Sequence, residues 1–149
     1  MPPKTGSGKT FENILATALK TSGYGFCRQV RVPGALAGRQ HVLDFVVTQP
    51  KQVLISVKWQ GTSGTTEEKI PFEVIRLSDL IRRGNITAFC QKDQITLSAQ
   101  KAYIVLAGNG WSLKDWYVKG GLHEFLPGCS NIRILDFYDF MNMVNSRSI

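Results

Sequence analysis

Cysteine is scarce in this chain, and its placement excludes two common architectures. Cys27, Cys90 and Cys129 lie far apart and form no Cys-x-x-Cys pair. An odd number at such spacing argues against a disulfide framework and against a zinc site. We therefore expect a reduced protein of the cytoplasm.

Long apolar runs are also missing. No run approaches the roughly 20 residues that a membrane-spanning helix needs, and the N-terminal MPPKTGSGKT lacks the apolar segment of a secretory signal. We expect no membrane partner. Gly8-Lys9-Thr10 does not complete a phosphate-binding loop, because Pro3 stands where that motif needs glycine and no strand precedes it. Residues 1–9 are expected to be mobile.

Acidic residues are few in the first 60 positions. Eight lysines and arginines there face two acids, Glu12 and Asp44, whereas residues 61–149 carry ten basic residues against nine acids. A basic half-domain predicts a polyanionic partner, because phosphate neutralisation supplies most non-specific affinity for nucleic acid. A merely solubilising surface is the alternative. The candidate DNA contacts are Lys9, Arg28, Arg31, Arg39, Lys51, Arg82 and Arg83.

The length of 149 residues and a hydrophobic content of 43% suit one domain, residues 1–149. Apolar periodicity predicts helices at 10–22, 67–83, 113–119 and 137–145, and strands at 24–31, 101–107 and 132–135, with a hairpin over 41–60. Pro71 is expected to kink the second helix or delay its start. Residues 84–100 are expected to form an excursion, in which 86–89 and 94–97 can pair. The order α-β-β-β-α-β predicts an α/β fold with a mixed central sheet flanked by helices.

Two charges stand inside the apolar strands of the 41–60 hairpin. An ionisable group in an apolar strand costs several kcal/mol unless it has a partner, a metal or water, so Asp44 and Lys58 each require an explanation. Alternation along a strand places Asp44 opposite in direction to Leu43, Phe45 and Val47. The same rule places Lys58 with Ser56 and Gln60 on one side.

This combination suits metal-dependent hydrolysis of a phosphodiester. Mg²⁺ binds one or two carboxylates together with water and substrate phosphate, so Asp44 and Glu12 are candidate ligands, with the backbone carbonyl of Val57 as another. Lys58 is the candidate group for polarising the attacking water and stabilising charge on phosphorus. Gln60 is a candidate for orienting water or a phosphate oxygen. The catalytic set is therefore Glu12, Asp44, Lys58 and Gln60, with Mn²⁺ expected to substitute for Mg²⁺.

Asp44 followed by Ser56-Val57-Lys58 resembles the signature of the PD-(D/E)XK nucleases, and Glu12 stands where many members keep a helical glutamate. Ser56 occupies the place of the usual second acid, so Glu12 or Gln60 must take that role. The resemblance implies a restriction-endonuclease-like core.

Three segments add to this resemblance: ISVKWQ at 55–60, GTTEEKIPFEV at 64–74, and GWSLKDWY at 110–117 followed by Gly120-Gly121-Leu122. They resemble the small homing endonucleases of this class from bacterial introns. The resemblance implies a site-specific endonuclease for double-stranded DNA that assembles as a homodimer or homotetramer. It would act in the cytoplasm of a bacterial or phage-infected cell and associate with the nucleoid when bound to DNA.

Other interpretations stay open at this point. Lys58 can be a strand-end lysine that reaches solvent, and Glu67, Glu68 and Glu73 read as the solvated face of a helix. A restriction-type or structure-specific junction or repair nuclease is an alternative on the same fold. A DNA-binding module whose catalytic site has decayed is the alternative from another functional class.

Overall fold

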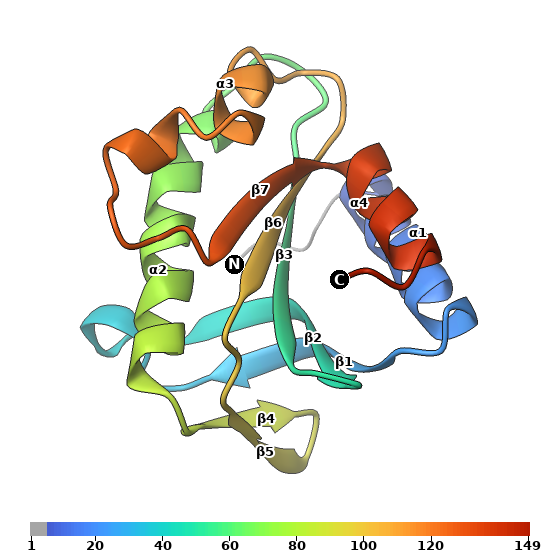
Figure 1. The fold of residues 1–149 in the computed structure, drawn as a ribbon, viewed down its shortest axis with the longest axis vertical. Coiled ribbons are helices and arrows are strands. Elements are labelled where there is room, and N and C mark those ends of the chain that lie inside the picture. The colour runs from blue at the N-terminus through green and yellow to red at the C-terminus, as the bar shows by residue number, and fades with distance from the viewer. Residues whose placement is uncertain (1–5) are drawn as a thin grey trace.

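A computed structural model of the chain describes residues 6–149 (Figure 1). Within them, α-helices span Gly6–Thr21 (α1), Ile70–Arg83 (α2), Lys114–Val118 (α3) and Phe137–Asn145 (α4). Strands span Gly25–Val32 (β1), His41–Gln49 (β2), Val53–Trp59 (β3), Ile86–Cys90 (β4), Asp93–Leu97 (β5), Ala102–Ala107 (β6) and Ile132–Asp136 (β7). The elements thus follow the predicted α/β order.

All seven strands form one mixed sheet in the order β5-β4-β1-β2-β3-β6-β7. From β5 to β3, each strand pairs antiparallel with the next strand in that order. The pairs β3–β6 and β6–β7 are parallel. The parallel strands therefore end together at one edge of the sheet, where Trp59, Ala107 and Asp136 lie. The predicted fold class, an α/β fold with a mixed central sheet flanked by helices, is therefore confirmed.

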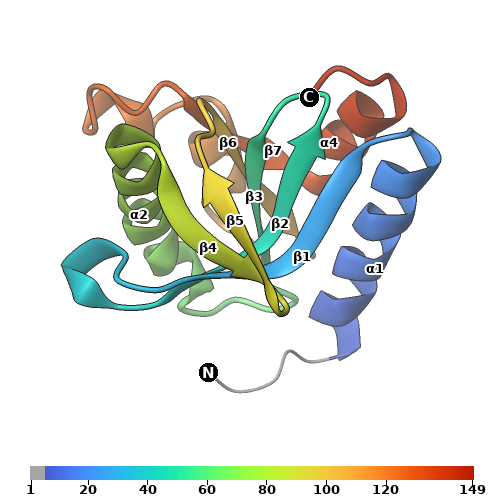
Figure 2. The same ribbon diagram turned by 90° about the horizontal axis from the view of Figure 1, so that it is seen from below.

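Helices cover both faces of the sheet (Figure 2). One hydrophobic cluster joins α2 to one face through residues such as Val74, Leu77 and Ile104. A second cluster joins α1 and α4 to the other face, with Leu15 and Phe140 fully buried in it. Burial of these two apolar layers fixes the positions of α1 and α2 on either side of β2 and β3.

The helix boundaries differ from the predictions in two places. The first helix begins at Gly6, so Thr10 lies inside it, and residues 6–9 are helical; residues 1–5 of the segment expected to be mobile lie outside the described residues. The second helix begins at Ile70 after a 3₁₀ turn, Thr66–Lys69. Pro71 occupies the first turn, where its missing N–H costs nothing, so the delayed start is confirmed.

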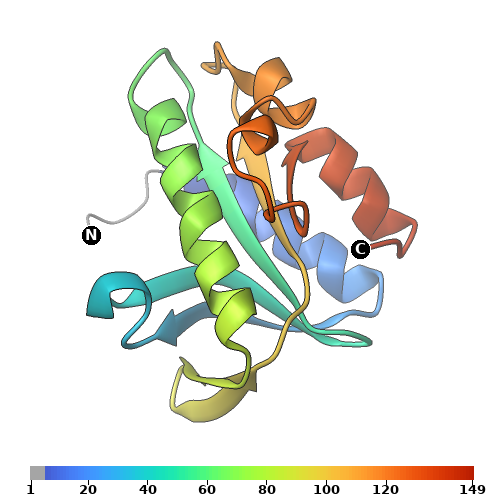
Figure 3. The same ribbon diagram turned by 60° about the vertical axis from the view of Figure 1, so that its left-hand side comes forward.

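Residues 84–100 belong to the sheet. The predicted pairing within this segment is present as the β4–β5 hairpin, and β4 also pairs with β1 through Arg31 and Phe89. The hairpin lies beside the C-terminal end of α2 (Figure 3). The segment between α2 and β6 therefore extends the sheet beyond β1, and the predicted pairing within it is confirmed.

Strict alternation of side chains fails on β2. Phe45 and Val47 contact the cluster under α1 and α4, as alternation requires, but Leu43 belongs to the cluster under α2. The break falls at Asp44, and on the neighbouring strand Gln29 lies at the same level with a φ of 52°. The prediction that Leu43 and Phe45 lie on the same face of the sheet was wrong. A change of backbone conformation at Asp44 places Leu43 on the α2 face and Phe45 on the α1 face.

No helix in residues 6–149 has the length and apolar character needed to cross a bilayer.

Candidate active site

Asp44 occupies the point where β2 and β3 separate. The two strands pair from Val47 with Val53 to Phe45 with Ile55. Beyond these pairs, the Asp44 carboxylate accepts a hydrogen bond from the backbone N–H of Val57 at 2.7 Å. Asp44 is only 6% exposed. The Asp44 side chain thus binds an N–H that a carbonyl of the neighbouring strand would otherwise bind. This hydrogen bond holds the carboxylate at the fork between the two strands.

Glu12 reaches the same level of the sheet from α1. Its side chain is 3% exposed, and its Oε1 accepts a hydrogen bond from Nε2 of Gln29 at 3.0 Å. The pairs Arg28 with Phe45 and Val30 with Leu43 place Gln29 directly across from Asp44. Gln29 therefore connects Glu12 of α1 to the level of β1 that lies across from Asp44.

Lys58 points toward α2, where it meets a buried acid. Its Nζ lies 3.2 Å from Oε2 of Glu73, which also lies 3.6 Å from the guanidinium of Arg76. Nε2 of His41 donates to Oε1 of Glu73 at 2.8 Å. Lys58 is 25% exposed and Glu73 is 3% exposed. Lys58 is thus a positioned lysine whose ammonium binds a carboxylate at the edge of the core.

The ionisation of Glu73 follows from these neighbours. Burial raises the pKa of its carboxyl, but the hydrogen bond from His41 and the charges of Lys58, His41 and Arg76 outweigh burial and lower the pKa to about 2. Glu73 is therefore ionised at neutral pH, and its charge attracts the Lys58 ammonium.

Gln60 follows β3 and joins two loops. Its Oε1 accepts from the N–H of Glu67 at 3.2 Å, and its Nε2 donates to the carbonyl of Gly110 at 2.7 Å. The side chain is buried. These contacts explain why a polar residue follows the strand, and they tie the segment after β3 to the segment after β6.

Glu67 organises the same two loops and does not lie on a solvated helix face. Its buried carboxylate accepts hydrogen bonds from the N–H and hydroxyl of Ser112 and from the N–H of Leu113. The Tyr117 hydroxyl donates to its backbone carbonyl at 2.5 Å. Burial raises the pKa of Glu67, but these hydrogen bonds outweigh burial and lower the pKa.

The predicted DNA contacts fall into two groups. Lys9, Arg39, Lys51 and Arg82 are exposed and form the first group. Arg28, Arg31 and Arg83 have protein partners: Arg28 donates to Asn13 and lies over the Phe45 ring, Arg31 donates to the carbonyl of Gln91, and Arg83 pairs with Asp79 and donates to the carbonyl of Gly34. Arg83 therefore serves to fasten the end of α2 to the loop before β2.

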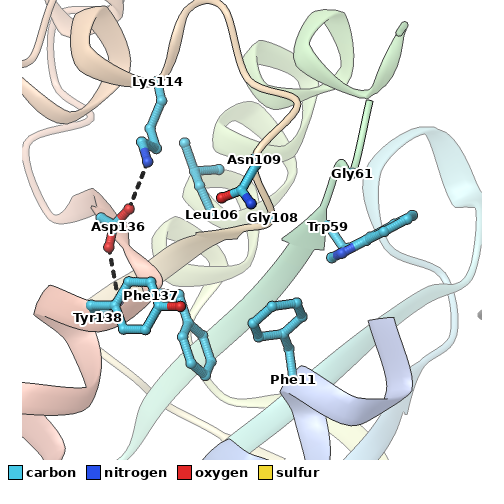
Figure 4. A pocket seen from close by; sticks show the side chains of 10 residues that line it. All are labelled: Phe11, Trp59, Gly61, Leu106, Gly108, Asn109, Lys114, Asp136, Phe137 and Tyr138. Atoms are coloured by element: carbon cyan, nitrogen blue, oxygen red, sulfur yellow. Dashed lines mark hydrogen bonds and ion pairs between the residues drawn. The ribbon is translucent and has the colours of Figure 1, made fainter. Parts of the chain in front are cut away.

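A cavity of about 280 Å³ adjoins the ends of the parallel strands (Figure 4). Phe11 of α1 and Trp59 of β3 form one side of it. Lys114 and Asp136 form an ion pair at 2.9 Å on another side. Phe11 directly precedes Glu12, and Trp59 directly follows Lys58, so the cavity borders the elements that carry the candidate site.

The donor chemistry at the fork fits a hard divalent cation. Asp44 and Glu12 supply buried carboxylates, and Val57 supplies a backbone carbonyl beside the N–H that binds Asp44. Among residues 6–149, no three His, Cys, Asp or Glu side chains form a cluster that can hold a metal ion alone. Such a site matches the way Mg²⁺ binds, through one or two carboxylates with water and substrate phosphate as the remaining ligands.

Three residues of this arrangement escaped sequence reasoning. Glu73 and His41 are the partners that hold Lys58, and Gln29 is the partner of Glu12. A signal for Glu73 exists in the sequence, because it lies among apolar residues of a helix that must cover the sheet. Gln29 left no such signal, since its role depends on a local backbone reversal.

Comparison with known proteins bears on this geometry. A family model described as a PD-(D/E)XK nuclease superfamily domain matches residues 4–147. No curated protein matches the chain.

Proposed function

The chain belongs to the PD-(D/E)XK nuclease superfamily, and on that premise we propose that it is a divalent-metal-dependent, site-specific endonuclease of double-stranded DNA. A homing endonuclease is the form of this activity that the sequence resemblance favours. One observation carries the proposal: the fork between β2 and β3 holds Asp44 on the N–H of Val57, and the very next residue is Lys58. The Asp44 carboxylate is thereby held at the end of the strand that carries Lys58, whose ammonium lies against Glu73 of α2.

The roles follow from position. Asp44, Glu12 and the carbonyl of Val57 would hold Mg²⁺ or Mn²⁺, which when bound activates water and neutralises charge on the phosphate. Lys58 carries a positive charge at the rim of the core, where it can bind the attacking water or a phosphate oxygen. Gln60 joins the loops that flank this strand end, and we propose that it supports the site through them.

Glu73 holds Lys58 in place from α2. Both of its carboxylate oxygens bind side-chain nitrogens, from His41 on one side and from Lys58 and Arg76 on the other. We assign it as a positioning residue for Lys58, because an unpaired lysine on a flexible stem would sample many orientations.

We propose that the active form is a homodimer or homotetramer bound to DNA in a bacterial or phage-infected cell. A chain of 149 residues covers a short stretch of duplex, so a long recognition site requires more than one copy. Sedimentation of the protein with and without duplex DNA tests the subunit number. A monomer that still cuts a long site would contradict the oligomer.

Cleavage of plasmid DNA with Mg²⁺, Mn²⁺ or no metal tests the central proposal. We expect the wild type to linearise plasmids that contain its site only when metal is present. The Lys58→Ala variant should bind DNA with an affinity within a small factor of wild type, because it loses one phosphate contact among many. It should fail to cut, because it lacks the proposed catalytic ammonium. Binding without cutting by the wild type under every metal would favour the decayed DNA-binding module.

The DNA that the protein cuts distinguishes a homing endonuclease from a restriction-type or structure-specific nuclease. Cutting at one long site favours the homing type, and cutting at a short repeated site favours the restriction type. Preference for junctions or mismatched duplexes over matched ones favours a structure-specific enzyme.

A further inference from the structure

The cavity of about 280 Å³ at the ends of β3, β6 and β7 has no part in the chemistry derived above. Its size lies near the lower limit of small-ligand sites, which suits a group as small as one nucleobase. Figure 4 shows its side chains projecting from several elements around one space. The occupant can be inferred from the character of these side chains.

Aromatic rings make up much of the lining. Phe11 and Phe137 form an edge-to-face pair at 4.9 Å, and Trp59 lines the same space with the nitrogen edge of its indole toward it. Tyr138 is 71% exposed, which is unusual for a large aromatic that only packs. Aromatic faces that are partly open to solvent are the usual platforms for unstacked bases.

The polar groups of the cavity favour a neutral ligand. The ammonium of Lys114 is paired with Asp136 at 2.9 Å, so the lining carries no surplus positive charge for a phosphate. Asn109 is exposed at the rim, and its amide offers both a donor and an acceptor. A planar group with π faces and a hydrogen-bonding edge fits this combination, and a nucleobase has both.

Position connects the cavity to the substrate. Phe11 and Trp59, which line the cavity, are the direct chain neighbours of Glu12 and Lys58, so the cavity borders the parts of α1 and β3 that carry the candidate site. We propose that the cavity binds one base of the substrate, unstacked from its neighbours and close to the scissile phosphate. This inference rests on the proposed nuclease function. The base is either extruded from a duplex or already unpaired in the substrate, and the contacts would be the same.

The test uses 2-aminopurine, a fluorescent base whose emission rises when it leaves the stack. After the cut is mapped, 2-aminopurine is placed at each position near it, in the matched duplex, in a mismatched duplex and in the single strand. The Asp44→Asn variant keeps the DNA intact during the measurement. We expect enhancement at one position. Enhancement in the matched duplex identifies an extruded base, and enhancement only in the other two identifies a base that was already unpaired.

Variants at the rim connect the signal to the cavity. Tyr138→Ala combined with Asn109→Ala should remove the enhancement and slow single-turnover cleavage about tenfold, as expected for the loss of one stacking contact. Tyr138→Phe keeps the ring and should retain the enhancement. Phe125→Ala is the matched control, because Phe125 is an equally exposed aromatic outside this cavity.

The outcomes separate the two proposals. If the wild type cuts DNA but no position shows enhancement, or if the double variant keeps both signal and rate, the base-binding cavity is refuted and the nuclease stands. If the wild type cuts nothing, the nuclease proposal falls and the cavity proposal falls with it.

Discussion

Each charged residue of the candidate site has a specific partner. Asp44 binds the N–H of Val57, Glu12 binds Gln29, and Lys58 binds Glu73. A buried charge is tolerated only when its hydrogen-bonding groups are satisfied. The partners therefore explain how the site can exist in a folded chain before any metal or DNA is bound.

Asp44→Asn separates the fold from the chemistry at this site. The amide oxygen of asparagine can still accept the hydrogen bond from Val57, so the melting temperature should change little, while the loss of a charged ligand should slow cleavage by roughly a hundredfold or more. Single-turnover cleavage and thermal unfolding measure the two effects. Asp139→Asn, an exposed acid of α4, is the control. Cleavage by Asp44→Asn at the control's rate would remove Asp44 from the site.

Glu73 makes stability depend on pH. Its pKa in the folded protein is lowered from 4.5 to about 2, so the stabilisation is present above about pH 4.5 and is lost as the pH falls toward 2. The full effect is on the order of 3 kcal/mol at most. We expect the difference in unfolding free energy between wild type and Glu73→Gln to shrink over that interval. Denaturant titrations at several pH values measure it, and a constant difference would contradict the assignment.

Sequence reasoning found Asp44, Lys58 and Glu12 because each is a charge in or beside an apolar pattern. It assigned Glu73 to solvent, because helical periodicity does not show which neighbouring strand residue a helix will face. The partner of Lys58 depends on how α2 lies across β3, which is a property of tertiary packing.

At the scale of elements, two loops form a single unit at the end of the parallel strands. The loop after β3 and the loop after β6 are joined through Gln60, Glu67 and Ser112. Gly108 lies where the two backbones come closest. Its φ is 96°, and a Cβ there would overlap the carbonyl oxygen of Gln60. The sequence showed glycines in this region but not the contact that requires them.

Gly108→Ala should therefore lower the unfolding free energy by more than the cost of an alanine at a positive φ. Gly34→Ala is the matched control, since Gly34 also has a positive φ, of 64°, but has open space around its Cα. The control should lose about 1 kcal/mol from strain, and Gly108→Ala should lose more because the loops must also move apart. Chemical denaturation compares the two. Equal losses would show that the close approach contributes nothing.

Gln60→Leu tests whether this residue supports the loops or takes part in the reaction. Removal of the amide leaves the Glu67 N–H and the Gly110 carbonyl without partners, so we expect a loss of about 1–3 kcal/mol in unfolding free energy. Cleavage at a temperature where the variant is folded should stay within several-fold of wild type. A large loss of cleavage at unchanged stability would instead support direct participation of Gln60.

The helices and strands themselves were largely predictable, because their apolar periodicities are regular. The exceptions are informative. Residues 84–100 lack strong periodicity because only Ala88 and Leu97 of the β4–β5 hairpin strands are buried, and the hairpin gains its order from pairing with β1. The change of backbone conformation at Gln29 and Asp44 departs from ideal strand geometry. Its role becomes clear only in the folded chain, where Gln29 binds Glu12.

Over the whole molecule, the proposed function predicts that the basic charge of the first 60 residues governs long-range attraction to DNA. Arg31→Gln should weaken binding and reduce the slope of log affinity against log salt by about one, because one phosphate contact is lost. Arg83→Gln should leave the slope unchanged and lower stability, since the charge of that guanidinium is already paired with Asp79, whereas Arg31 binds only the neutral carbonyl of Gln91. Fluorescence anisotropy over a salt series measures the slopes. An unchanged slope for Arg31→Gln would remove this strand from the interface.

The sharing of one hydrophobic cluster by α1 and α4 has a consequence for synthesis. The ribosome releases α1, which carries Glu12, long before it releases α4. Until α4 arrives, the apolar side of α1 has only part of its covering, and its attachment to the sheet is weak. A translation product that stops before residue 137 therefore lacks a firmly seated Glu12. Under the proposed function, the capacity to cut DNA is therefore acquired only once α4 has been made.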